Sequence, residues 1–86
     1  MRILKWTLAT TDRQSFQMPK GAQILSVQAQ GENAQLWTLC DPSAPPEMRH
    51  FAIYGTGNPI DGAPGSYIGT YQIMGGRFVG HVFEVQ

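Results

Sequence analysis

Alternating polar and apolar side chains constrain this chain more than any other feature of its sequence. In residues 22–30, Leu25, Val27 and Ala29 alternate with one serine and two glutamines. A period of two turns successive side chains to opposite faces of a β-strand, so one face can be buried while the other is solvated. No segment has the apolar spacing of three and four residues that predicts an amphipathic helix of more than one turn. The pattern therefore predicts an all-β protein.

Six segments carry this strand pattern, and a seventh is weaker. The six are residues 2–8, 22–30, 34–40, 48–54, 67–73 and 77–85, and the weaker one is residues 14–18. The turn residues 31–33 predict a hairpin between the second and third of the six. Gly75-Gly76 predicts a two-residue type I′ turn in a final hairpin, because both positions of that turn need positive φ.

Two segments rich in proline and glycine separate the strands. Residues 41–47 contain three prolines, which cannot donate to a β-ladder. Residues 55–66 contain four glycines and two prolines and form the longest irregular stretch. Long ordered loops often carry function, so this second loop is the first place to look for a site.

These elements predict a small barrel or sandwich of six to seven short, mostly antiparallel strands joined by tight turns. We expect residues 1–86 to form a single β domain, because 86 residues suffice for one domain and not for two. A domain of this size has a thin core and does not enclose a large substrate cavity. Open sheet edges need covering or pairing, and pairing between copies predicts a homo-oligomer.

The charge pattern and the cysteine count indicate which partners and which cell compartment suit this protein. Six basic and six acidic residues give a net charge of zero, and the basic residues are scattered, which argues against direct binding to nucleic acid. The single cysteine, Cys40, excludes an intrachain disulfide and indicates a reducing compartment. The chain has neither the apolar run of a signal peptide nor that of a membrane span. We expect a cytoplasmic protein with no membrane partner.

Cys40, His50 and His81 are the candidates for nucleophilic or metal chemistry. A zinc site needs three or four ligands, and paired spacings such as Cys-x-x-Cys are absent. A reactive thiol needs a neighbouring base or positive field. His81 lies on the same strand face as Val79 and Phe83, where a histidine is more often hydrogen-bonded within the fold. We therefore predict no catalytic residue, no metal site, no cofactor and no enzymatic activity.

The candidate binding residues lie in and around the glycine-rich loop. Its first residues follow a predicted strand, and glycine there brings backbone N–H groups close to an anion such as phosphate. The alternative is a turn that needs positive φ at glycine. Three tyrosines flank or follow the loop, with Tyr67 and Tyr71 on one face of the predicted strand 67–73. They either stack on a base and anchor a partner, or cover the sheet with their hydroxyls in water. The candidate ligand- or partner-binding residues are Tyr54, Gly55, Thr56, Gly57, Asn58, Tyr67 and Tyr71.

An ordered set of motifs extends over nearly the whole chain. It consists of residues 18–27, Leu36-Trp37, Asp41-Pro42, residues 51–60, residues 67–72, Gly76 and residues 81–84. With these motifs the chain resembles DUF7352, a domain of unknown function found in short bacteriophage and prophage proteins. The resemblance implies a phage origin. It also implies action by stoichiometric binding, as for other small accessory proteins without a catalytic signature.

We therefore expect a non-enzymatic phage or prophage accessory protein that binds and inhibits or modulates a host defence protein in the host cytoplasm. One alternative is an oligomeric protein that binds a small ligand or sequesters a nucleotide. A second alternative is a small structural subunit of the phage.

Overall fold

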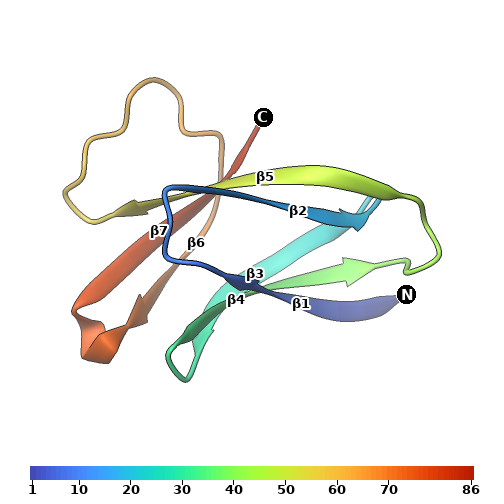
Figure 1. Ribbon diagram of the computed structural model, residues 1–86, viewed down its shortest axis with the longest axis horizontal. Coiled ribbons are helices and arrows are strands. Elements are labelled where there is room, and N and C mark those ends of the chain that lie inside the picture. Colours follow the sequence, from blue (N-terminus) through green and yellow to red (C-terminus); the bar gives the residue numbers. More distant parts are fainter.

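Seven strands pair only with antiparallel neighbours and divide into two sheets (Figure 1). The computed structural model describes residues 1–86. One sheet has the strand order β1-β4-β3, and the other has the order β2-β5-β7-β6. The strands are β1 (Arg2–Leu8), β2 (Arg13–Pro19), β3 (Gln23–Gln30), β4 (Asn33–Cys40), β5 (Pro46–Gly55), β6 (Ser66–Ile73) and β7 (Phe78–Val85), with one turn of 3₁₀ helix, η1 (Met74–Gly76). The predicted all-β class is confirmed.

The two sheets face each other as a small sandwich. The Cα atoms span 39 × 31 × 16 Å, and the shortest dimension suits two stacked sheets. On one side the edge strands β3 and β6 touch, since a Cβ added at Gly69 would lie only 2.8 Å from Cγ1 of Val27. On the other side β1 and β2 pack through Trp6 and Phe16, whose ring centroids are 5.8 Å apart. No helix is long and apolar enough to cross a membrane.

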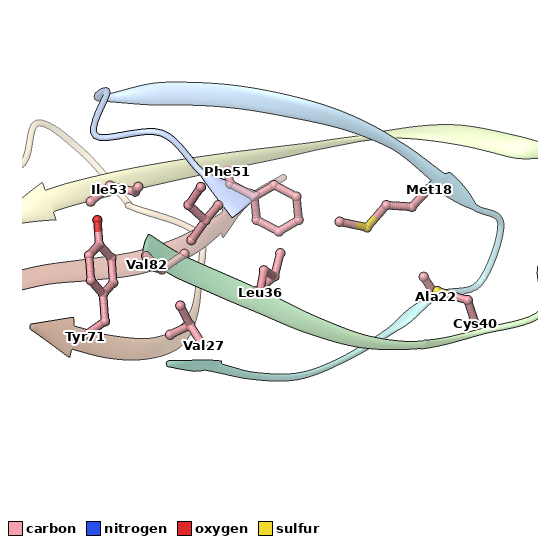
Figure 2. Packing of buried hydrophobic residues seen from close by; sticks show 11 residues of the cluster. Met18, Ala22, Val27, Leu36, Cys40, Phe51, Ile53, Tyr71 and Val82 are labelled. Carbon is pink, nitrogen blue, oxygen red and sulfur yellow. The ribbon is translucent and has the colours of Figure 1, made fainter. Parts of the chain in front are cut away.

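The core lies between the sheets and is thin, as the chain length predicts. Figure 2 shows Phe51, Met18, Leu36 and Val82 pointing into this space from both sheets. Each of these four side chains is completely buried. Their loss of contact with water is the main favourable term for folding, at roughly 1.5–3 kcal/mol for each buried side chain of this size.

Two bulges change which residues face the core. The ladders slip by one residue at Leu25 in β3 and at Ile68 in β6. An extra residue in one strand moves the following side chains to the opposite face. Leu25 is therefore 43 % exposed while Val27 is buried, and the prediction that they share a face is wrong. The prediction for residues 67–73 is wrong for the same reason, because Tyr67 lies outside the sandwich and Tyr71 inside it.

The two predicted hairpins are present, but one of their turns differs. Gln30 pairs with Asn33, so the predicted tight turn at residues 31–33 is present but contains only Gly31 and Glu32. In the final hairpin the connection has four residues, 74–77, so the predicted two-residue turn is wrong. Gly75 and Gly76 do have positive φ, at 64° and 85°. The weaker predicted segment 14–18 lies within β2.

Arg49 ties the two sheets together at the end of the sandwich. Arg49 on β5 forms a bidentate pair with Glu84 on β7, with 2.9 Å between Nη2 and Oε1. Its Nη1 donates to the carbonyl of Ala22, just before β3, at 2.8 Å. Both charged side chains are mostly buried, and the Glu84 carboxylate raises the pKa of Arg49. Arg49 thus bridges the four-stranded sheet and the start of a strand in the other sheet.

We predict that Arg49→Gln lowers the free energy of unfolding by about 3 kcal/mol, because it leaves the Glu84 carboxylate and the Ala22 carbonyl without their charged partner. Urea denaturation measures the change. The exposed Arg2→Gln variant is the control, with an expected change below about 0.5 kcal/mol. Equal stability of the two variants would show that Arg49 does not help to hold the sheets together.

Candidate functional site

The largest surface hollow lies where the loop after β5 meets the connection between β1 and β2. It has a volume of about 470 Å³, within the range of small-molecule sites. Its lining comprises Asp12, Arg13, Ile53, Tyr54, Asn58, Pro59 and Asp61. A second hollow of about 70 Å³ shares Asp12, Ile53 and Asn58 with it and adds Gly55 and Phe78. The two hollows therefore share part of their walls, and together they are the candidate site.

Backbone hydrogen bonds hold the walls of this site in place. The N–H of Ile53 donates to the carbonyl of Asp12 at 3.0 Å and fixes the β1–β2 connection against β5. The N–H of Asn58 donates to the carbonyl of Gly55 at 3.1 Å, and that of Thr56 to Val79 at 3.3 Å. These two N–H groups are already used within the fold. The loop is thus built as a turn.

Two glycines are needed for the shape of that turn. Gly57 has φ of 86°, a conformation that costs a residue with a Cβ about 1 kcal/mol. Gly55 allows Asn58 to fold back over the main chain, since an added Cβ would lie 2.9 Å from Asn58 Nδ2. The Asn58 amide is placed between the two hollows by this close approach.

Three charged side chains surround the larger hollow, and none of them is paired. Asp12, Arg13 and Asp61 are exposed and take part in no ion pair, since the single salt bridge of the molecule joins Arg49 and Glu84. Their charges sum to minus one. A ligand here would meet two carboxylate acceptors and one guanidinium donor, with the ring of Tyr54 as the aromatic wall.

A chain of hydrogen bonds crosses the outer face of the four-stranded sheet next to this site. Thr56 Oγ1 lies 2.8 Å from Nε2 of His81, and Nδ1 of His81 lies 2.9 Å from Oγ1 of Thr70. Thr70 Oγ1 in turn lies 2.6 Å from the hydroxyl of Tyr67. Hydroxyl groups can donate or accept, so they satisfy both nitrogens of a neutral imidazole. His81 is hydrogen-bonded within the fold, as its strand position predicted.

Aromatic rings pack beside this chain of hydrogen bonds. Phe83 contacts Tyr54 and Tyr67 edge-on, with ring centroids 5.8 and 5.4 Å apart. Edge-to-face contacts of this kind add to the stability of each ring position. Tyr54 belongs both to this aromatic group and to the lining of the larger hollow.

The whole outer face of the four-stranded sheet is poor in charge. Phe51, Ile53 and Val82 point into the core. The strand register then identifies the residues of the sheet that point the other way. They are Arg13, Ser15, Gln17, Met48, His50, Ala52, Tyr54, Tyr67, Thr70, Gln72, Val79, His81, Phe83 and Val85. Only Arg13, at the margin, carries a formal charge. We call this set the outer face.

The predicted binding residues fall in three different places. Tyr54 and Asn58 line the larger hollow, and Gly55 lines the smaller one. Thr56 and Tyr67 belong to the hydrogen-bonded chain on the surface of the sheet.

Gly57 and Tyr71 line neither hollow, and Tyr71 requires a correction. Its side chain is only 3 % exposed, because the bulge in β6 turns it into the core. It therefore presents no ring to a surface ligand. Its hydroxyl is buried without a hydrogen-bond partner, and this burial raises the pKa of Tyr71.

Asp12, Arg13, Asp61 and Phe83 are parts of these surfaces that the sequence did not reveal. Arg13 reaches the surface beside Tyr54 because β2 pairs with β5, which places Arg13 opposite Ala52. Nothing in the local sequence indicates that pairing. A charged pair in a short connection between two strands is otherwise an ordinary turn composition.

The candidates for nucleophilic and metal chemistry do not come together. Cys40 is completely buried, and its thiol lies 3.1 Å from the hydroxyl of Thr38. His50 lies on the outer face, where Nδ1 is 2.6 Å from Oγ of Ser15. No three histidine, cysteine or acidic side chains are grouped so that they could hold a metal ion.

A comparison with protein families gives one result. The family described as domain of unknown function DUF7352 matches residues 1–86, which is the whole chain described here. No curated protein and no solved structure matches the chain.

We predict that Gly55→Ala moves the Asn58 side chain out of its place between the hollows, because the new Cβ would lie 2.9 Å from Nδ2. The cost in stability is expected to stay below about 1 kcal/mol, since Asn58 is an exposed side chain that can move. NMR of the Asn58 side-chain amide measures the displacement. Gly57→Ala is the contrasting variant, with a loss of about 1 kcal/mol from its positive φ. An unchanged Asn58 amide signal in Gly55→Ala would contradict the prediction.

We also predict that the protein loses stability at alkaline pH through Tyr71. Burial raises the pKa of Tyr71 in the folded state, so the unfolded state releases the proton first. The stability lost as pH rises above about 10 reaches at most about 1.4 kcal/mol per pH unit. Urea denaturation between pH 9 and 11 measures it. Tyr71→Phe is expected to remove this part of the pH dependence, and an identical slope in both proteins would contradict the assignment.

Proposed function

The chain belongs to the DUF7352 family, and we propose that it is a non-enzymatic binding protein whose outer face binds another protein. The observation that carries the proposal is the composition of that face, where aromatic and aliphatic side chains gather and one formal charge lies at the margin. Depletion of charge and enrichment of tyrosine, phenylalanine and methionine characterise the centre of protein interfaces.

The exposed aromatic side chain of the outer face, Tyr67, is held in a fixed position by its neighbours. Tyr67 is 59 % exposed, yet its ring packs against Phe83 and its hydroxyl against Thr70. Met48 is 53 % exposed and adds an adaptable apolar contact on the same face. Side chains that are already ordered lose less entropy on binding, so the exposed Tyr67 ring is suited to be an interface anchor.

The size of the outer face limits the complex it can form. Four strands about 4.8 Å apart and about eight residues long cover roughly 500 Å². A standard interface buries about 800 Å² on each partner, so the sheet alone supports a small or weak interface. The loop beside Tyr54 continues this surface and would supply the remaining area in a tighter complex.

We propose a host protein as the partner, with the chain acting as a phage or prophage accessory protein in the host cytoplasm. The resemblance to short phage and prophage proteins supports this context, and inhibition or modulation of a defence protein is the role it suggests. The outer face carries a charge only at its margin, at Arg13, which supports a partner surface that is itself apolar or aromatic, since a charged patch would lose its hydration without a counter-charge.

A second candidate function is binding of a small ligand in the hollow beside Tyr54. The observation that favours it is a concave site of about 470 Å³ with three unpaired charged groups and an aromatic wall. A nucleotide fits this description, because it combines a planar base with an anionic group. In this function the chain would sequester a nucleotide, as a single copy or as an oligomer.

We predict that Tyr67→Glu abolishes binding of the host partner, because it replaces an exposed aromatic anchor of the outer face with a charge. Gln28→Glu, at an exposed position on the three-stranded sheet, is the control. A tagged chain is used to capture partners from host lysate, and each captured protein is then purified and titrated against both variants. The expected result is a defined stoichiometry and at least about a 30-fold loss of affinity for Tyr67→Glu only.

Three outcomes would overturn the proposal. The first is a purified partner that binds both variants equally, and the second is recovery of the chain in purified virions, which would indicate a structural subunit. The third comes from light scattering of the chain alone. If wild type is a dimer and Tyr67→Glu is a monomer, a second copy covers the outer face in place of a host protein.

A further inference from the structure

Four strands form the edges of the two sheets, and they differ in regularity. β3 and β6 each carry a bulge, and they touch one another at Val27 and Gly69. β1 and β2 have no bulge, and each is paired over its whole length with a single neighbour. Bulges and contacts with other elements protect a sheet edge from further pairing. The unprotected edges are therefore β1 and β2, which lie on the same side of the sandwich.

The hydrogen bonds at the two ends of β2 show which of its backbone groups are free. The carbonyl of Asp12 accepts from β5, and the N–H of Lys20 donates to the residue just before β5. Both bonds fit one register, in which every even-numbered residue of β2 has its backbone groups directed to β5. The backbone groups of Ser15 and Gln17 therefore point to the open side of the strand.

At the end of β1 a side-chain amide occupies the place of a neighbouring strand. The Gln14 amide donates to the carbonyl of Ala9 at 2.8 Å and accepts from its N–H at 2.9 Å. A residue of a paired antiparallel strand would form the same two bonds. Because alternate residues of a strand point their backbone groups to the same side, those of Lys5 and Thr7 are directed as in Ala9. The rest of this edge is free to pair.

The one charge near the middle of the β1 edge is held away from it. Lysine on an edge strand commonly prevents pairing with another chain. Here the Lys5 ammonium donates to Oε1 of Gln30 at 2.7 Å and lies 5.7 Å from the centroid of the Trp37 ring. Gln30 belongs to β3, on the far side of β4, so the lysine side chain extends over β4. Its charge is thus directed away from the open edge.

We propose that the edges of β1 and β2 form an interface with a second copy of this chain, in which β1 pairs with β1 and β2 with β2. A two-fold axis perpendicular to the sheets reverses the strand direction, so it produces both antiparallel pairs at once. Trp6 and Phe16 are half-buried with ring centroids 5.8 Å apart, and one axis passes beside both. Ser15 of one copy then pairs with Gln17 of the other.

The presence of two open edges on one side selects a second copy over an extended peptide. A single peptide strand can pair with the edge of β1 or with that of β2, and it leaves the other open. A second sandwich presents two edges at the same separation. It also covers the half-buried rings of Trp6 and Phe16 with an identical pair of rings.

The area of this interface predicts a weak dimer. A strand of seven residues is about 23 Å long, and the contact across both sheets covers roughly 400 Å² on each copy. A standard interface buries about 800 Å² on each partner, so we expect a Kd of about 100 μM. About four backbone hydrogen bonds in each pair of strands fix the register of the dimer.

This pairing leaves the outer face of the four-stranded sheet open. The four strands of each copy become half of one continuous sheet, and the two outer faces lie side by side. The area available to a partner protein then doubles from roughly 500 Å² to roughly 1,000 Å². The dimer does not depend on the proposed function, but it removes the area limit of a single copy.

Analytical ultracentrifugation of the full chain, from about 10 μM to about 1 mM, measures the Kd of the dimer. Gln17→Pro is the test variant, because proline there removes a free N–H of the edge and no bond of the ladder with β5. It is expected to raise the Kd at least about 30-fold, since each copy in the dimer loses a backbone hydrogen bond.

Gln72→Pro is the matched control on the opposite edge of the same sheet. The carbonyl of Val79 accepts from Thr56 next to β5, so Gln72, its neighbour on β6, also has its N–H on an open edge. Both glutamines are exposed. Gln72→Pro is expected to dimerise as wild type does, and urea denaturation shows that both variants are folded.

Amide hydrogen exchange of wild type is a second readout that needs no variant. With a Kd of about 100 μM, the amides of Ser15 and Gln17 are expected to exchange about four times more slowly at about 1 mM than at about 10 μM. The amides of Phe16 and Met18 are bonded to β5, so they are expected to be protected at both concentrations.

Several results would overturn the proposal. Wild type that stays monomeric at about 1 mM excludes the dimer. Equal Kd values for the two proline variants would show that the edge of β2 is not the interface. Protection of Ser15 and Gln17 only by a captured host protein would show that a segment of that protein pairs here. Tyr67→Glu is expected to leave the dimer intact, so host binding and dimer formation can fail separately.

Discussion

Burial of one face of each sheet against the other is the constraint on which the rest of this structure depends. The chain is short, so its core is a single layer of side chains around Phe51, Leu36 and Val82. Such a core leaves no interior for an enclosed reaction site. Everything that can contact a partner therefore lies on the outward faces or in the loops at the ends of the strands. Arg49 extends the contact between the sheets beyond the apolar core, because its guanidinium, paired with Glu84 within one sheet, also donates to the carbonyl of Ala22 just before β3.

The same constraint explains why the candidate surfaces lie where they do. The inward residues of β5, β7 and β6 are taken by the core, and their alternate neighbours form the outer face. Those neighbours are aromatic and hydroxyl-bearing, which is unusual for a face that water covers. The loop after β5 leaves the sheet beside this face. Tyr54 is the residue common to the outer face and the larger hollow, so occupation of one surface is expected to affect the other.

Tyr71 is the core residue whose side chain is not fully explained by packing. Its ring is part of the core, where Gly80 leaves room for it, and its hydroxyl is buried between the sheets. A phenylalanine would satisfy the core equally well. The hydroxyl is therefore the part of the side chain that packing does not require.

The alternation of polar and apolar residues determined the all-β class and the approximate limits of the strands, because that signal is local. Glycine at 31, 57, 75 and 76 marked turns for the same reason, since positive φ is a property of one residue. The bulges at Leu25 and Ile68 were decided by the tertiary structure alone. The sequence of β3 or β6 alone is compatible with either set of alternate residues facing the core. The pairing of β3 with β4 and of β6 with β7 decides which set is buried. Likewise Arg13 and Tyr54 come together only because β2 pairs with β5, a long-range contact that leaves no trace in the residues around either position.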